Sequence, residues 1–171
     1  LISVPEQYAV AIETAFGAAL QNIVTDSEGD AKRAIQFLKE TKGGRATFLP
    51  LSAVRGRMLE ERGLAQCDGF VAVASDLVKC DATYEAVVKA QVGRTAVAED
   101  MDCAIAIARK FSYRFRIVTL DGQIINAGGS MTGGSRMQNA GFLSRSNEIE
   151  KLRTEMQAAQ AKLSEGAAAY K

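Results

Sequence analysis

The sequence contains no histidine, and this absence excludes several kinds of catalytic and metal site. Ser-His-Asp and Cys-His nucleophile systems need an imidazole base, and many zinc sites need imidazole ligands. Carboxylate or lysine chemistry stays open, but no paired motif of that kind stands in the sequence. We therefore expect this chain to carry no catalytic site, no metal site and no cofactor.

Cysteine is also scarce. The three cysteines, Cys67, Cys80 and Cys103, are odd in number and form no CxxC pair. A metal cluster or a disulfide framework is therefore not expected, and a reducing, cytoplasmic environment fits this usage. We interpret the cysteines as small apolar residues that are buried or half-buried.

Long apolar runs and an excess of one charge are missing too. No run approaches the roughly 18 residues of a membrane span, and no signal peptide is recognisable, so we expect no membrane partner. The 21 basic and 20 acidic residues leave a net charge of +1. A global basic field cannot attract nucleic acid, so any such binding would need local patches.

The chain has 171 residues, of which 47% are hydrophobic, and this is enough for the core of one domain or two small ones. Asp121-Gly122 is a hairpin-turn signal. Hydrophobic periodicity predicts helices at residues 8–20, 31–38, 84–92 and 101–108, and strands at residues 22–24, 45–49, 70–74, 95–98, 114–120 and 123–126. This alternation predicts a mixed α/β (α+β) fold.

Part of the pattern occurs twice. Tyr8 is followed nine residues later by Gly17, and Tyr84 is followed nine residues later by Gly93. Two later strands also match, as Arg45-x-x-Phe48-Leu49-x-Leu51 and Arg114-x-x-Ile117-Val118-x-Leu120. We interpret the chain as two pseudo-repeated α/β subdomains, residues 1–55 and 70–146, joined by a connector at residues 56–69. A chance similarity of common elements is the alternative.

The last segment, residues 147–171, has a different pattern. Its apolar or small residues recur at alternating spacings of three and four, as in a heptad seam: Ile149, Leu152, Met156, Ala159, Leu163, Gly166 and Tyr170. The pattern predicts the start of a coiled-coil helix. An amphipathic helix that packs on its own domain is the alternative.

The stretch NAGGSMTGGS, residues 126–135, is rich in glycine and allows three interpretations. The spacing of a phosphate-binding P-loop is present, but Gly134 stands where that loop needs its lysine. A nucleotide- or phosphate-binding α/β domain is therefore one hypothesis, and a flexible linker is another. The third is a close approach of backbones at a sheet edge, because residues 123–126 would form an edge strand that invites pairing by another chain.

Four motifs in this order resemble the hinge domain of SMC proteins, most closely that of bacterial condensin. They are GRATFLPL (44–51), VASDLV (73–78), TLDG (119–122) and GGSMTGGS (128–135). The resemblance implies a two-fold homodimer in which the first half of one chain meets the second half of its partner. It places Gly128, Gly129, Gly133 and Gly134 at this interface.

The resemblance also implies properties of the longer protein. SMC proteins are cytoplasmic, nucleoid-associated ATPases that bind DNA and act in chromosome condensation and segregation. Their ATP sites and their kleisin-type partners belong to distant head domains, so the hinge itself is not an enzyme. A strand, a helix and an incoming coiled-coil helix are expected upstream of Leu1.

Two basic clusters are candidates for weak, sequence-independent DNA contact that prefers single strands. Arg114 and Arg116 would share one side of a strand and form a directed patch. The candidates are Lys42, Arg45, Arg55, Arg57, Arg109, Lys110, Arg114 and Arg116. A solvated charged face without a ligand is the alternative.

Overall fold

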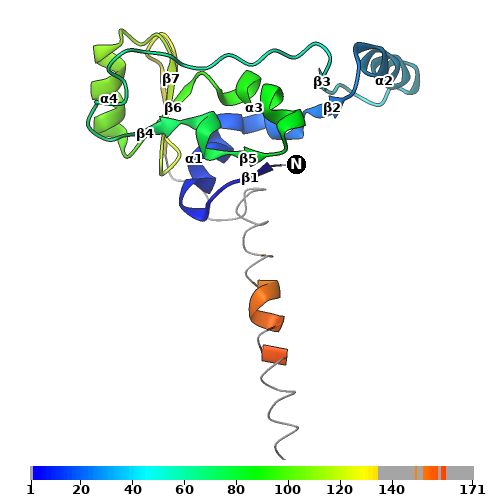
Figure 1. The fold of residues 1–171 in the computed structure, drawn as a ribbon. Helices are drawn as coiled ribbons and strands as arrows, with labels where there is room; N and C mark the ends of the chain where they lie inside the picture. Colours follow the sequence, from blue (N-terminus) through cyan, green and yellow to red (C-terminus); the bar gives the residue numbers. More distant parts are fainter. Residues whose placement is uncertain (1, 135–148, 150–151, 158, 161–171) are drawn as a thin grey trace, which may run out of the picture. The chain divides into compact units, whose positions relative to one another are not determined.

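The computed structural model describes residues 2–134, 149, 152–157 and 159–160 (Figure 1). The chain divides into two units, Leu1–Arg136 and Met137–Lys171. In the first unit helices and strands alternate along the chain, as the mixed α/β prediction requires. No helix among the described residues is long and apolar enough to cross a membrane.

A small parallel sheet with one helix forms one end of the first unit (Figure 1). Strands β2 (Ile23–Thr25) and β3 (Phe48–Pro50) pair in parallel, and helix α2 (Glu28–Thr41) connects them. A capping box starts α2, because the Ser27 hydroxyl accepts from the Asp30 N–H while the Asp30 carboxylate accepts from the Ser27 N–H.

The strand predicted at residues 45–49 begins three residues later than expected, at Phe48. The helix ends with Lys42 in the left-handed conformation, and Gly44 at φ +87° continues the turn, so the extended backbone starts only at Phe48. Pro50 is part of the strand, paired with Thr25. Proline is tolerated there because β3 is an edge strand.

A five-stranded sheet forms the other end of the unit, with the strand order β4-β6-β7-β8-β9. Its strands are β4 (Phe70–Val73), β6 (Thr95–Ala98), β7 (Arg116–Thr119), β8 (Ile124–Ile125) and β9 (Met131–Thr132). β6 and β7 are parallel and joined through helix α4 (Met101–Lys110), while the other neighbours are antiparallel. The predicted hairpin at Asp121-Gly122 is confirmed, although β7 is shorter than residues 114–120.

Helices cover both faces of this sheet. Alternate residues of the central strands, such as Ala96 and Ile117, join a core formed with α4 and with Leu59 and Leu64 of the connector. The opposite face carries the fully buried Val97 and Val118. Helix α1 (Ala9–Phe16) packs there against β7 and against α3 (Glu85–Val92).

The order helix, strand, helix, strand recurs in the two halves of the unit. Tyr8 and Tyr84 are the N-cap residues of α1 and α3, with nearly equal backbone angles (φ −107° and −101°). Each is also the last residue of a short 3-10 helix. Gly17 and Gly93 are the C-caps of the same helices. The two copies also touch, because β1 (Ile2–Ser3) pairs antiparallel with β5 (Lys79–Cys80). The subdomain boundaries at residues 55, 70 and 146 stay a prediction.

The tail is described only at residues 149, 152–157 and 159–160, which are helical. Within these residues Ile149, Leu152 and Met156 are exposed, each by more than half. Part of the predicted seam therefore lies uncovered in the single chain. Leu163, Gly166 and Tyr170 lie outside the described residues, and the coiled coil stays a prediction.

Candidate interface at the glycine edge

The glycine stretch is folded into the sheet rather than held as an open loop. Gly128 and Gly129, at φ +86° and +94°, form the turn that leads from β8 to β9. The Gly128 N–H donates to the Tyr113 carbonyl at 2.9 Å, and the Gly129 N–H donates to the Asn126 carbonyl at 2.9 Å. These donors face protein carbonyls, so this turn does not offer a phosphate the row of free N–H groups that a P-loop uses.

The edge of the sheet is not where the sequence indicated. Residues 123–126 were expected to be the exposed edge strand, but β9 pairs with β8 and covers it. That expectation was wrong because the turn at Gly128 and Gly129 is tight enough to return the chain at once. Since β8 is the one strand that pairs with β9 among the described residues, the glycine stretch itself supplies the free edge.

The ladder shows which groups point outward from β9. Asn126 N–H donates to the Ser130 carbonyl, so this pair is a hydrogen-bonded one. Hydrogen-bonded and non-hydrogen-bonded pairs alternate along antiparallel strands, so the N–H groups of Met131 and Gly133 point away from β8. The Met131 side chain is 52% exposed, and Thr132, Gly133 and Gly134 are exposed as well. This edge is ready to pair with another strand.

Gly133 and Gly134 are held by a single side chain. Gln123 accepts from the Gly134 N–H at 2.9 Å and donates through Nε2 to the Gly134 carbonyl at 3.4 Å. A Cβ on Gly133 would lie 2.0 Å from Gln123 Oε1, so a larger residue there displaces this clamp. A hollow of about 350 Å³ lies beside these glycines, and its other wall includes Thr14 and Gly17 from the end of α1.

The four predicted interface glycines therefore have two different places. Gly133 and Gly134 lie at the free edge, whereas Gly128 and Gly129 form the intramolecular turn that creates the edge. Sequence spacing could not separate these places, because both pairs read as Gly-Gly. The hydrogen bonds of the Gly128 and Gly129 N–H groups to the Tyr113 and Asn126 carbonyls distinguish the turn pair from the edge pair, and they are visible only in the structure.

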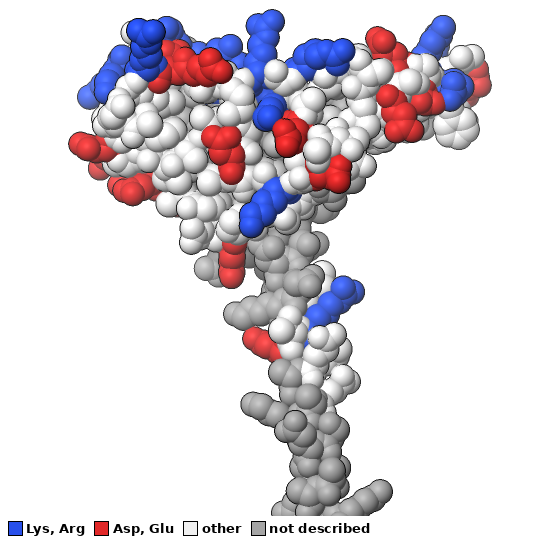
Figure 2. All heavy atoms as spheres, in the orientation of Figure 1, with Lys and Arg blue, Asp and Glu red and all other residues white. Residues whose placement is uncertain are grey.

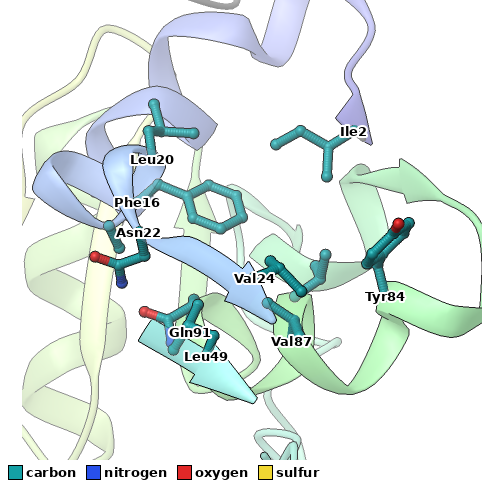
Figure 3. A pocket seen from close by; sticks show the side chains of 11 residues that line it. Ile2, Phe16, Leu20, Asn22, Val24, Leu49, Tyr84, Val87 and Gln91 are labelled. Carbon is teal, nitrogen blue, oxygen red and sulfur yellow. The ribbon is translucent and has the colours of Figure 1, made fainter. Parts of the chain in front are cut away.

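A second apolar feature went unnoticed in the sequence. A hollow of about 270 Å³ lies between the β2–β3 sheet and α3 (Figure 3). Phe16, Leu20, Val24, Leu49 and Val87 point into it. Ile23, the first residue of β2, is 45% exposed. The first half thus shows apolar surface next to strands whose outer edges pair with nothing in the described part of the chain.

Basic side chains gather along one side of the first unit. Figure 2 shows Lys and Arg along the upper edge of the view, over the elements α4, connector and α2 of Figure 1, with acidic residues among them. Lys42, Arg45, Arg55, Arg57 and Arg109 are exposed there or on neighbouring segments. Most of the predicted DNA-contact residues are therefore accessible to phosphate.

Two further candidates are already engaged. Lys110 lies 3.3 Å from Cys67 Sγ and over the Phe111 ring, and Arg114 forms an ion pair with Glu61 at 2.9 Å. Arg114 also donates from Nε to the Phe111 carbonyl. Their charge is exposed but partly satisfied, so they are weaker candidates than Arg57 or Arg109.

Arg116 departs from its predicted role. The expected side-by-side placement of Arg114 and Arg116 on one strand is wrong, because β7 begins at Arg116 and Arg114 precedes it. Arg116 turns to the α1 face of the sheet and donates to the Ala15 and Thr14 carbonyls. Burial lowers the pKa of this guanidinium from its ordinary value. It belongs to the interior link between α1 and β7.

The cysteines form no site in the described residues. All three are free and half-buried, as expected. Burial raises the pKa of the Cys80 thiol, and the hydrogen bond with Asp100 raises the pKa of the Cys103 thiol, so neither favours a reactive thiolate. Within residues 2–134 and the described part of the tail, no three Cys, Asp or Glu side chains lie close enough to hold a metal ion.

Comparison with known proteins agrees with this geometry. The sequence profile described as "SMC proteins Flexible Hinge Domain" matches residues 1–108. The Chromosome partition protein Smc of Bacillus subtilis (strain 168) is 46% identical over 154 residues, which cover 88% of this chain and 13% of that protein. The protein of the same name from Methanocaldococcus jannaschii is 44% identical over 129 residues, covering 75% and 11%. The chain thus spans a small part of these relatives.

Two solved structures share the fold. One is an asymmetric dimer of the Geobacillus stearothermophilus SMC hinge domain, with a TM-score of 0.84 and 43% identity, covering 96% of this chain and 67% of that one. The other is the Pyrococcus furiosus SMC protein hinge domain, with a TM-score of 0.66 and 33% identity, covering 83% and 74%.

Proposed function

Because the chain belongs to the SMC hinge family, we propose that it is the homodimerisation hinge of a bacterial chromosome-partition SMC protein. The observation that carries the proposal is the free β9 edge, where exposed Gly133 and Gly134 leave room for another backbone. The dimer in the Geobacillus stearothermophilus structure supports self-association in a related hinge.

The partner surface in this proposal is the first half of the second copy. The outer edges of β2 and β3 pair with no further strand among the described residues, and the exposed Ile23 offers apolar area beside them. Pairing β9 of one copy with this small sheet of the other satisfies both edges. A two-fold axis then generates the same contact a second time, and the closed dimer leaves neither edge exposed.

The longer protein is expected to act in chromosome condensation and segregation at the nucleoid. Its ATPase activity and its kleisin-type partners would belong to distant head domains, and this chain would be non-catalytic. Its own secondary activity would be weak DNA contact, carried by Arg55, Arg57 and Arg109 with Lys42 and Arg45. Exposed guanidinium groups bind phosphates without reading sequence.

Proline substitutions on β9 test the dimer proposal. Met131→Pro removes an N–H that points away from β8, so it should raise the dimer dissociation constant at least tenfold while the sheet persists. Light scattering over a wide dilution range measures the mass, and circular dichroism measures the fold. A matched control is Met101→Pro at the first turn of α4, where proline is tolerated.

Two results would contradict the proposal. The first is a wild-type chain that stays monomeric at high concentration, also when it is extended upstream. The second is a folded Met131→Pro variant that dimerises as tightly as the wild type.

A further inference from the structure

We propose that Arg116 is a positioning residue that sets the angle between the two dimerising surfaces of one chain. This inference rests on the proposed function, because it takes the β9 edge and the β2–β3 sheet as those surfaces. With Arg116 in place, pairing closes into a two-fold dimer. Without it, the same surfaces pair less tightly and can continue into open chains.

The contact joins residues about one hundred positions apart. From the first position of β7, Arg116 donates through NH1 to the Ala15 carbonyl at 2.9 Å and through NH2 to the Thr14 carbonyl at 3.2 Å. Both carbonyls belong to the last turn of α1, where the helix dipole favours a cation. The planar guanidinium reaches the two carbonyls with two separate nitrogens in a fixed fork, whereas lysine has a single nitrogen.

The clamp sits where the chain leaves the large sheet for the small one. Helix α1 ends at Phe16, and Gly17 at φ +52° turns the backbone into the 3-10 helix Gly17–Gln21, which leads directly to β2. On the other side, β7 pairs with β8, and β8 pairs with β9. One side chain therefore connects the strand system of the glycine edge to the root of the β2–β3 sheet.

Helix α1 also packs on β7 and α3 through buried residues such as Ile12 and Ala15, so the Arg116 clamp adds to that packing, whereas the small sheet beyond α1 is held less closely. The apolar hollow separates Val24 and Leu49 from α3, so close packing does not lock the small sheet against that helix (Figure 3). The Arg116 Nε atom is buried and has no hydrogen-bond partner within the described residues. Leaving this buried N–H unpaired costs folding free energy. The hydrogen bonds of the other two guanidinium nitrogens, which fix the position of α1 on β7, offset that cost.

Symmetry explains why the angle matters. Each copy contributes two different surfaces, so every contact is between unlike patches. Such contacts close into a ring only when the rotation between the patches fits the number of copies, and otherwise they extend as open assemblies. A loosened angle therefore changes the kind of assembly and not merely its strength.

The test compares Arg116→Met with Arg116→Lys and with Arg114→Met. Methionine keeps the apolar stem and removes the donors, whereas lysine keeps one charged donor group. Arg114→Met is the matched control, because that arginine also makes two hydrogen bonds, to the Phe111 carbonyl and the Glu61 carboxylate, but lies outside the junction. Circular dichroism and thermal unfolding check the fold, and light scattering with serial dilution measures mass and affinity.

For a folded Arg116→Met variant we expect the dimer dissociation constant to rise at least tenfold and species larger than a dimer to appear at high concentration. Arg116→Lys should restore part of the closed dimer, and Arg114→Met should match the wild type. A folded Arg116→Met variant that forms only a wild-type dimer overturns the inference. So does unfolding of both Arg116 variants, because the role is then purely structural. A monomeric wild type instead refutes the proposed function.

Discussion

Individual glycines show how one residue type serves different purposes in this chain. Gly17 and Gly93 occupy matching C-cap positions, yet Gly17 has a positive φ with open space around it, and Gly93 has φ −64°. A Cβ on Gly93 would lie 2.3 Å from the Arg57 carbonyl, and one on Gly56 would lie 2.3 Å from the Lys89 Cβ. These two glycines let the connector backbone lie flush against the end of α3.

Gly93→Ala should therefore destabilise the fold by about 1–3 kcal/mol through overpacking, because the neighbouring carbonyl is backbone and cannot rotate away. Gly29→Ala in α2 is the control with the opposite sign. Its Cβ meets only ordinary contacts at 3.5 Å or more, and alanine favours the helix by about 0.5–1 kcal/mol. Urea unfolding of both variants measures this contrast. Equal effects would contradict the close approach.

Gly128→Ala isolates the effect of backbone angle at the β8–β9 turn. No atom lies within 4 Å of the added Cβ, so the cost should be the strain of a left-handed residue, about 1–2 kcal/mol. Gly128→Asn should cost less, because asparagine tolerates this region. Urea unfolding at protein concentrations below the dimer dissociation constant measures the monomer alone, and so separates this strain from interface effects. An alanine variant as stable as the wild type would refute the assigned turn.

At the scale of elements, helix α2 was predicted at residues 31–38 but begins at Glu28, because its start signal is a capping box that hydrophobic periodicity does not detect. Ser27 and Asp30 form the capping box within four residues, and Arg33 pairs with Asp30 on the next turn. The short strands β1, β5 and β9 were missed, because two residues show no periodicity, whereas the equally short β8 was indicated by the hairpin turn before it. Their pairing is decided by partners that are distant in the sequence or reached through a tight turn.

The capping box predicts a pH dependence of stability. The hydrogen bond from Ser27, helped by Arg33, lowers the pKa of the Asp30 carboxyl from its ordinary 3.8. The ionised carboxylate is thus favoured in the folded state, so its contribution is complete above pH 3.8 and is lost as the pH falls further. Asp30→Asn should lower the melting temperature at pH 7 and match the wild type near the acid end.

Thermal unfolding of both proteins between about pH 7 and pH 2.5 measures this convergence. Glu28→Gln is the control, because it removes a carboxylate from the same turn but leaves the capping box intact. A difference between wild type and Asp30→Asn that stays constant with pH would show that the carboxylate charge is irrelevant to the cap.

For the whole molecule, the balanced net charge of +1 means that the proposed DNA binding depends on where the cations lie. Arg57→Glu should weaken binding to single-stranded DNA at least threefold, and the wild-type affinity should fall about tenfold between roughly 50 and 200 mM salt if two or three phosphates are contacted. Lys79→Glu is the control, because it changes the net charge equally at an exposed position of β5, a strand that carries none of the candidate residues. Fluorescence anisotropy measures all three, and equal loss in both variants would point to charge alone.

The sequence by itself determined the order of the longer helices and strands, the repeat of helix caps and the family, because these depend on local chemistry and short motifs. The tertiary structure decided which glycines form the turn and which the edge, and which of the candidate arginines are exposed or buried. Arg116 shows the reason: Ala15 and Thr14 lie about one hundred residues away, and folding alone brings their carbonyls to its guanidinium. Contacts of that separation follow from the packing of α1 on β7, which no local pattern encodes.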